Sequence, residues 1–162
     1  MALADADAVL ALARSARLTL ATAESLTGGA LCAELVAVPG ASESVRGGVI
    51  AYDVAMKHRL LDVDASMLED PGPVSQEVAQ AMATGARRAL DADVAVATTG
   101  VAGPDPHGGH AAGTVWVAVD CGGVRTARLL HLSGDRADVV SGTVRSALDL
   151  ARNALEARAA GS

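Results

Sequence analysis

The stretch LTLATAESLTGG, residues 18–29, sets the fold class of this chain. Its apolar first half predicts a buried strand over Leu18–Ala23, and a helix over Thr27–Val38 follows until Val-Pro-Gly stops it. Ser25 then lies at the junction, at the carboxyl end of the strand. A carboxylate, a serine, a threonine and two glycines at such a place suit three roles: helix punctuation, a cradle for an anion, or the seat of a nucleophile.

Similar signals continue along the rest of the chain. Hydrophobic periodicity predicts three more helices, over residues 3–16, from the cap Ser75 to Leu90, and over 135–159, and four more strands, over 45–52, 92–100, 114–120 and 124–133. Helices separate the early strands, and Cys121-Gly-Gly joins the last two as a hairpin. The order predicts an α/β fold, a three-layer α/β/α sandwich on a mixed, mainly parallel five-stranded sheet. We expect a single domain over residues 1–162.

The composition argues against several classes of protein. The formal net charge is −6 and the sequence has no basic stripe, which argues against a nucleic-acid partner. The N-terminus lacks a cationic start, and no apolar run is long enough to cross a bilayer, so we expect neither a signal peptide nor a membrane partner. Cys32 and Cys121 form no metal-binding pattern and are expected to be free thiols. We therefore expect a soluble, cytoplasmic protein.

Ser25 is the first candidate functional residue. Open α/β sheets bind ligands at the carboxyl ends of their strands, and the amides of Thr27, Gly28 and Gly29 at a helix start can donate to an anion. The alternative is that Ser25 or Thr27 is an ordinary N-cap and that the glycines allow tight packing. Glu24 is either a hydrogen-bond acceptor behind the site or a solvated carboxylate, and the stretch alone leaves this open.

Tyr52 and Lys57, in GGVIAYDVAMK, are the second pair of candidates. Tyr52 ends a strand and Lys57 follows on a short helix; each alone is typical of an ordinary strand end or a solvated helix. Because Ser25, Tyr52 and Lys57 all follow strands, they can project from one edge of the sheet. A neutral lysine there can deprotonate a serine, provided that its surroundings lower its pKa from about 10.4.

Two further stretches have features of anion sites. The residues TTG at 98–100 end the central strand, and the glycine-rich turn after them either binds a phosphate or an oxyanion or simply begins a long loop. Arg136 follows the expected cap Asp135, where a cation opposes the helix dipole, so it either holds an anion or pairs with a nearby aspartate. His107 and His110 have no third ligand nearby, so we expect no metal.

Assembled, these stretches resemble the CinA C-terminal-domain family, the nicotinamide-nucleotide amidohydrolases. The resemblance runs from about residue 5 to residue 155 and is carried, in the family's order and spacing, by TAESLTGG, RGGVIAYDVAMK, GPVSQEVAQAMATGA, TTGVAGPD, GTVWVAV and SGDR. It implies hydrolysis of the carboxamide of nicotinamide mononucleotide (NMN) to nicotinate mononucleotide and ammonia. It also implies a homodimer that needs no cofactor or metal.

The resemblance assigns roles to matching residues. It makes Ser25 the nucleophile, and Tyr52 and Lys57 the residues that assist proton transfer. It matches Thr99 and Gly100 to a polar turn beside the site and Arg136 to a residue that holds the substrate. With the helix-start candidates, the expected substrate-binding residues are Thr27, Gly28, Gly29, Thr99, Gly100 and Arg136.

The chain also departs from the usual pattern of this family. Val54 stands where Asn is usual and Leu26 where Cys is frequent. The loop before GTVW reads GGHAAG without the usual Lys-Pro pair, and ADVVSG after SGDR lacks a second arginine. The large N-terminal domain of many relatives is missing, so we expect a stand-alone form. Two other functions stay open: a nucleotide-binding protein of the same fold without turnover, and a Ser-Lys hydrolase of another small amide.

Overall fold

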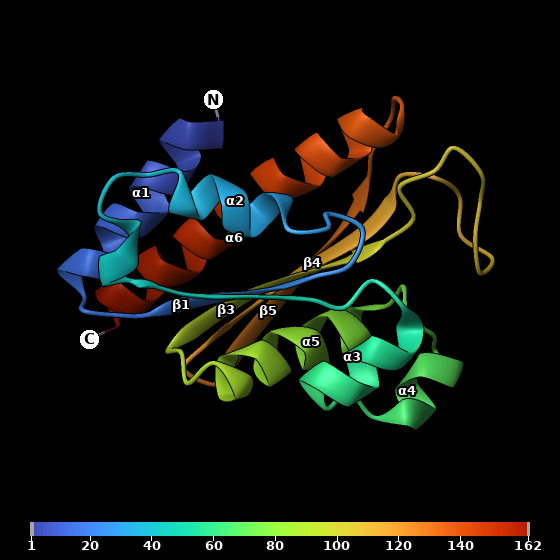
Figure 1. Ribbon diagram of the computed structural model, residues 1–162, viewed down its shortest axis with the longest axis horizontal. Helices are drawn as coiled ribbons and strands as arrows, with labels where there is room; N and C mark the ends of the chain where they lie inside the picture. The colour runs from blue at the N-terminus through green and yellow to red at the C-terminus, as the bar shows by residue number, and fades with distance from the viewer. Residues whose placement is uncertain (1, 162) are drawn as a thin grey trace.

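Helices and strands alternate up to a final hairpin in the computed structural model, which describes residues 2–161 (Figure 1). In chain order the elements are α1 (Ala2–Ser15), β1 (Leu20–Glu24), α2 (Ala30–Val36), the 3-10 turn η1 (Ala41–Glu43), β2 (Val45–Ile50), α3 (Val54–Leu61), α4 (Ala65–Glu69), α5 (Gln76–Ala89), β3 (Val94–Gly100), β4 (Thr114–Cys121), β5 (Val124–His131) and α6 (Arg136–Ala160). The five strands expected from the sequence are all present.

The strands form one mixed sheet in the order β2-β1-β3-β4-β5. β1 pairs in parallel with both β2 and β3, whereas β3–β4 and β4–β5 are antiparallel pairs. β5 therefore points the same way as β1, β2 and β3, and within the described chain β4 is the strand that runs against the others. This confirms the prediction of a mixed, mainly parallel sheet.

Helices cover both faces of the sheet (Figure 1). α1, α2 and α6 lie on one face, over a core that includes Leu10, Leu31 and Leu148. α3 and α5 lie on the other face with α4 beside α5, over a second core that includes Val78 and Met82. The predicted three-layer α/β/α sandwich is confirmed. β1 is buried along its whole length, as expected for a strand with a layer of helices on each side.

The helix after β1 differs from its prediction. It was expected over Thr27–Val38, but α2 spans Ala30–Val36. The physical reason is that Gly28 and Gly29 have φ angles of 55° and 102°, in the left-handed region, which a right-handed helix cannot include. The five residues after β1 are therefore a turn, and this turn carries Ser25. α4 was not predicted from the sequence. It is a single short helical turn capped by Asp64.

Gly85, in the middle of α5, allows α5 and α3 to pack closely. A Cβ atom at this position would overlap the backbone carbonyl oxygen of Leu61, at the end of α3. Backbone atoms cannot move aside as a side chain can, so we expect Gly85→Ala to lower the free energy of unfolding by about 2 kcal/mol in spite of its better helix propensity. Urea unfolding measures this loss.

Gly142→Ala, in α6, is the matched control. The added Cβ atom would meet only the flexible end of the Leu132 side chain, at 3.2 Å, so we expect little change in stability. Equal stability of the two variants would contradict the close packing of α3 on α5.

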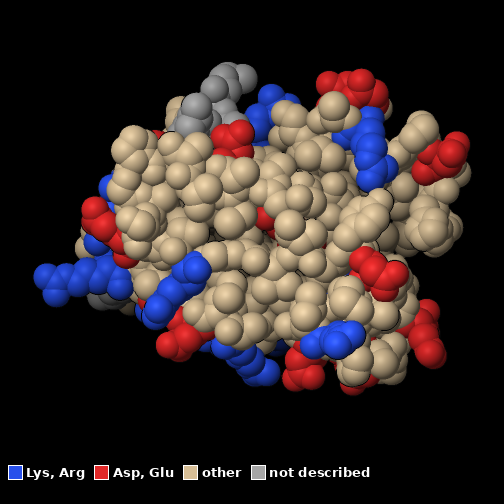
Figure 2. Space-filling view, in the orientation of Figure 1, with Lys and Arg blue, Asp and Glu red and all other residues tan. Residues whose placement is uncertain are grey.

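The surface has no single-signed stripe on the face drawn in Figure 2. Lys and Arg side chains are scattered among Asp and Glu, mainly around the rim of the view. Within residues 2–161, no helix combines the length and the apolar character that a membrane span requires.

Candidate active site

Ser25 is the first residue after β1, and the backbone holds it against the neighbouring strand. Its amide donates a hydrogen bond to the carbonyl oxygen of Thr98 in β3 at 3.1 Å. The residue is 7% exposed, yet it lines a cavity at the carboxyl end of the parallel strands. The tight turn after β1 thus presents a hydroxyl at the sheet edge where such folds bind ligands.

Lys57 reaches this hydroxyl from α3. Its Nζ atom lies 2.9 Å from Ser25 Oγ, 2.8 Å from the carbonyl oxygen of Ala51 and 3.4 Å from that of Tyr52. The side chain is 2% exposed, and no carboxylate lies within salt-bridge distance of it in the described structure. When the amine is neutral, its two N–H groups can donate to the two carbonyls while its lone pair faces the Ser25 hydroxyl.

Burial changes the acidity of Lys57. Removal from water lowers the pKa of this amine from its ordinary 10.5 to about 8, and the negative charge of Asp53 opposes the change in part. At pH 7, about one lysine in ten is then neutral, against about one in three thousand for an ordinary lysine. A base that is partly neutral near physiological pH is suited to general base catalysis.

Glu24 is a hydrogen-bond acceptor at the start of α2, whereas the sequence left open whether it is an acceptor or a solvated carboxylate. This carboxylate is buried, and it accepts hydrogen bonds from the amides of Leu31 and Cys32 at 2.8 and 3.0 Å and from the Thr27 hydroxyl at 2.7 Å. The positive end of α2 is therefore occupied by the chain's own carboxylate. This corrects the expectation that the helix start offers its amides to a bound anion.

Four of the expected substrate-binding residues lie outside the cavity lining. The Thr27 hydroxyl is buried between Glu24 and the Thr98 hydroxyl. Gly28 and Gly29 form the left-handed turn, and the Gly28 amide donates to the carbonyl oxygen of Ser25. The Thr99 hydroxyl points to the other side of β3 and donates to the carbonyl oxygen of Pro73 at 2.7 Å. None of these four residues is therefore part of the cavity lining.

The cavity itself has a volume of about 440 Å³ and contains the other expected residues. Ser25, Tyr52, Lys57, Gly100 and Arg136 all line it. The rest of the lining, which the sequence reasoning did not single out as site residues, consists of Leu26, Asp53, Val54, Pro73, Val74, Val101, Ala102, Gly103, Asp105 and His107. Of these residues, Asp53 could have been identified from the sequence as an N-cap, since an aspartate directly before a short helix is typical of that position.

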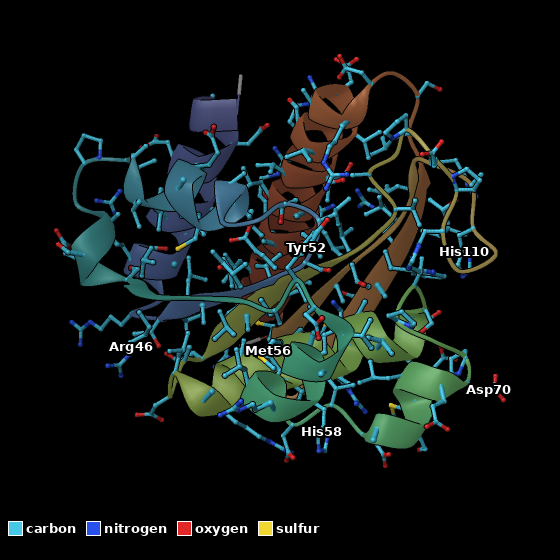
Figure 3. The ribbon with its side chains drawn as sticks, turned by 45° about the vertical axis from the view of Figure 1, so that its right-hand side comes forward. Arg46, Tyr52, Met56, His58, Asp70 and His110 are labelled. Carbon is cyan, nitrogen blue, oxygen red and sulfur yellow. The ribbon has the colours of Figure 1, made fainter. Side chains whose placement is uncertain are left out.

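Tyr52 and Arg136 form a bridge at the cavity. Arg136 Nη2 donates to the Tyr52 hydroxyl at 3.1 Å, and Arg136 Nη1 donates to the carbonyl oxygen of Gly103 at 2.9 Å. Tyr52 is 62% exposed and lies between the α6 layer and α3 (Figure 3). Its hydroxyl thus contacts the expected anion-binding residue, and it is the Tyr52 backbone carbonyl that contacts Lys57.

The histidines of the long loop do not gather with other ligands. His107 and His110 bond to each other through their backbones, and His110 lies out on the loop (Figure 3). No group of three or more His, Cys, Asp or Glu side chains with metal-binding geometry occurs in the described part of the chain.

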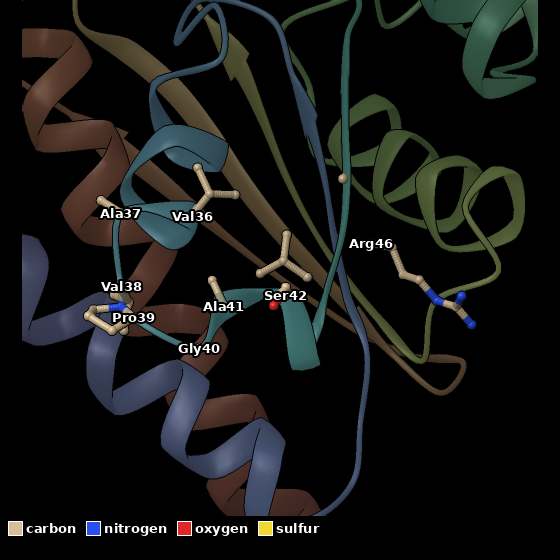
Figure 4. Close-up of a pocket in the computed structure, with 10 residues that line it drawn as sticks. Val36, Ala37, Val38, Pro39, Gly40, Ala41, Ser42 and Arg46 are labelled. Atoms are coloured by element: carbon tan, nitrogen blue, oxygen red, sulfur yellow. The ribbon is translucent and has the colours of Figure 1, made fainter.

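A second cavity, of about 500 Å³, lies at the other end of α2 (Figure 4). Its lining, from residues 36–42 and 45–47, consists mostly of glycines and small apolar residues, with the Arg46 side chain turned away from the rest. This cavity offers no nucleophile paired with a base, whereas the cavity at Ser25 does. The chemistry therefore favours the slightly smaller site.

Known proteins are similar to this chain in both sequence and fold. The CinA C-terminal domain family matches residues 3–155. A CinA-like protein of Gemmatimonas aurantiaca is 49% identical over 89% of this chain, and one of Frankia casuarinae is 44% identical over 85%. These matches cover 34% and 32% of the two relatives, so the chain spans about a third of their length.

Solved structures agree with this relationship. A CinA-superfamily protein of Klebsiella pneumoniae superposes with a TM-score of 0.93 at 32% identity, covering 96% of this chain and 98% of the other. One from Escherichia coli gives a TM-score of 0.90 at 35% identity, covering 93% and 88%. The chain therefore belongs to the CinA C-terminal-domain family.

Proposed function

We propose that the protein is an amidohydrolase that converts NMN to nicotinate mononucleotide and ammonia. The observation that carries the proposal is the 2.9 Å contact between the buried Lys57 amine and the Ser25 hydroxyl, inside a cavity that also holds Arg136. A nucleophile paired with a base of lowered pKa is the arrangement that acyl transfer requires. The family resemblance supplies the substrate.

The first half of the reaction forms an acyl-enzyme. Neutral Lys57 takes the Ser25 proton as Oγ attacks the carboxamide carbon, which gives a tetrahedral intermediate with a negative oxygen. The Lys57 ammonium then returns the proton to the departing nitrogen, so ammonia leaves and an ester to Ser25 remains. In the second half, Lys57 takes a proton from water, the resulting hydroxide attacks the ester, and the proton returns to Ser25 Oγ as nicotinate mononucleotide leaves.

The negative oxygen of the intermediate needs backbone donors. Two amides of the turns expected to supply them are already bonded, since Gly28 donates to the Ser25 carbonyl and Val101 to the Thr114 carbonyl. Leu26 follows the nucleophile directly and lines the cavity. The proposal therefore assigns the Leu26 amide as an oxyanion donor.

Arg136 is the proposed phosphate-binding residue. Its guanidinium is held at the cavity by two neutral acceptors, the Gly103 carbonyl and the Tyr52 hydroxyl. A phosphate is a stronger, charged acceptor and suits the planar guanidinium. The apo contacts thus fix the cation in place without neutralising it. The small-molecule substrate and the homodimer implied by the resemblance both remain predictions.

Tyr52→Phe tests whether the tyrosine acts through Arg136. Loss of a single exposed hydrogen bond to Arg136 should raise KM for NMN about two- to tenfold, while kcat stays unchanged, because the Lys57–Ser25 pair keeps its contacts. Steady-state kinetics separate the two constants. In an Arg136→Ala background, the same substitution should have no further effect. A fall in kcat at constant KM would instead place the hydroxyl in proton transfer.

The direct test of the proposed function is incubation of the purified protein with NMN and no added metal. Ammonia and nicotinate mononucleotide should appear in equal amounts. Binding of NMN by calorimetry without any product would favour a nucleotide-binding protein that lacks turnover. Val54, an apolar residue in the cavity lining where the family usually has Asn, is the position to which such a loss of turnover would point. The other alternative is a Ser-Lys hydrolase of another small amide. A panel of carboxamides in the same ammonia assay separates that candidate from the first.

A further inference from the structure

Asp53 is a carboxylate of the cavity that the proposed reaction does not use. It is the N-cap of α3, where Oδ1 accepts a hydrogen bond from the Ala55 amide at 2.8 Å. Its side chain is exposed and lines the same cavity as Ser25 and Lys57. Asp53 stands four residues before Lys57, a spacing that puts both side chains on one side of the first turn of α3. One carboxylate oxygen makes the cap, and the side chain is part of the cavity lining.

The charged side chains of the cavity come from different elements of the fold. Arg136, at the start of α6, donates hydrogen bonds to the Gly103 carbonyl and the Tyr52 hydroxyl. Asp53 caps α3, the helix that carries the base, and its negative charge raises the pKa of Lys57. The remaining carboxylate of the lining, Asp105, lies on the long loop. An elongated substrate that places an anion at Arg136 has its reacting group at Ser25 and Lys57, within reach of the negative charge that Asp53 exerts on Lys57.

We propose that Asp53 is a specificity-determining residue that selects amides attached to a cationic ring. The inference rests on the proposed function: the pyridinium ring of NMN carries a positive charge next to the scissile carboxamide, and its phosphate carries the negative charge that suits Arg136. A carboxylate beside the reacting amide attracts such a ring, and it gives no comparable advantage to a neutral ring of the same shape.

The same carboxylate has a second, separable effect on the base. It raises the pKa of Lys57 against the larger lowering by burial. The other groups that contact the amine are neutral: the Ser25 hydroxyl from the end of β1 and two carbonyls of the segment before α3. Removal of the Asp53 charge should therefore shift the acid limb of the pH–rate profile to lower pH for every substrate, whatever the charge of its ring.

Asp53→Asn tests the proposal with two ligands that differ in ring charge. NMN has a cationic pyridinium, and its reduced form NMNH has a neutral dihydropyridine with the same carboxamide, ribose and phosphate. Asparagine also caps helices, so α3 should keep its start. At pH 9, above the acid limb, we expect kcat/KM for NMN to fall about three- to tenfold, the range for an exposed charge pair up to one partly shielded from water. The kcat/KM for NMNH should stay unchanged; if NMNH is not hydrolysed, its inhibition constant should stay unchanged.

Asp105→Asn is the matched control, since it removes the other carboxylate of the lining. It should not change the ratio of kcat/KM for NMN to kcat/KM for NMNH. An equal change for NMN and NMNH in Asp53→Asn would overturn the proposal, and so would no change for either. Failure of the proposed function has a different signature, because the wild-type protein would then release no ammonia from NMN. In that case calorimetry gives the same comparison: Asp53→Asn should weaken NMN binding alone.

Discussion

Ser25→Ala is expected to reduce kcat for NMN hydrolysis by at least about 10³-fold, the scale of loss when the nucleophile of an acyl-transfer enzyme is removed. The substitution removes one oxygen atom, and with it one of the three hydrogen bonds of the Lys57 amine. The other two remain, as does the bond from the Ser25 amide to Thr98. The cavity should therefore keep its shape, and the loss should be chemical.

Three measurements make this expectation decisive. Ammonia release gives kcat, calorimetry gives NMN binding, and urea unfolding gives stability. Ser25→Ala should bind NMN within a few-fold of the wild-type protein. Ser42→Ala, which removes an exposed hydroxyl at the other cavity, should change none of the three. If kcat of Ser25→Ala stayed within tenfold of the wild-type value, water activated by Lys57 would attack the amide directly. The acyl-enzyme mechanism would then be wrong.

The proximity of Ser25 and Lys57 could be predicted from the sequence because it follows from the order and direction of the strands. β1 and β2 are parallel neighbours, so the residues after them meet at one edge of the sheet. Lys57 is four residues into α3, which begins shortly after β2. Strand order and direction place the two side chains near each other; burial of the amine needs the packed structure.

The roles of Glu24, Thr99 and Tyr52 could not be predicted in the same way. Glu24 caps a helix that begins six residues later, and this depends on the left-handed turn between them. Thr98 and Thr99 are adjacent on a strand, so their side chains take opposite faces, but only the packed sheet tells which face meets the site. The Tyr52 hydroxyl finds its partner Arg136 in the last helix, far away in sequence.

Lys57→Met is expected to reduce kcat as severely as Ser25→Ala, because methionine keeps a long unbranched side chain but has no base. Lys57→Arg should be equally inactive, since a guanidinium stays protonated. In the wild-type protein, kcat/KM should rise tenfold per pH unit up to about pH 8 and then level off, as the amine loses its proton. A profile that is flat from pH 6 to 9 would show that protonated Lys57 is active and would exclude it as the general base.

The lowered pKa of Lys57 also makes a prediction about stability that does not depend on any substrate. The folded protein holds the amine at a pKa of about 8, whereas in the unfolded chain the ordinary value is 10.5, so between these values the unfolded state binds more protons. Wild-type stability relative to Lys57→Met should therefore increase as the pH rises through this window. Below pH 8 the penalty for burying the charge is constant at about 3 kcal/mol.

Between pH 7 and pH 10 the difference in unfolding free energy between the two proteins should shift by about 2 to 3 kcal/mol in favour of the wild type. The unpaired carbonyls of Ala51 and Tyr52 in Lys57→Met add a cost that does not depend on pH, so the shift and not the absolute difference reports on the amine. Urea unfolding at the two pH values measures it. A pH-independent difference would mean that Lys57 keeps an ordinary pKa in the folded protein, and the Ser25–Lys57 pair would then lack its neutral base.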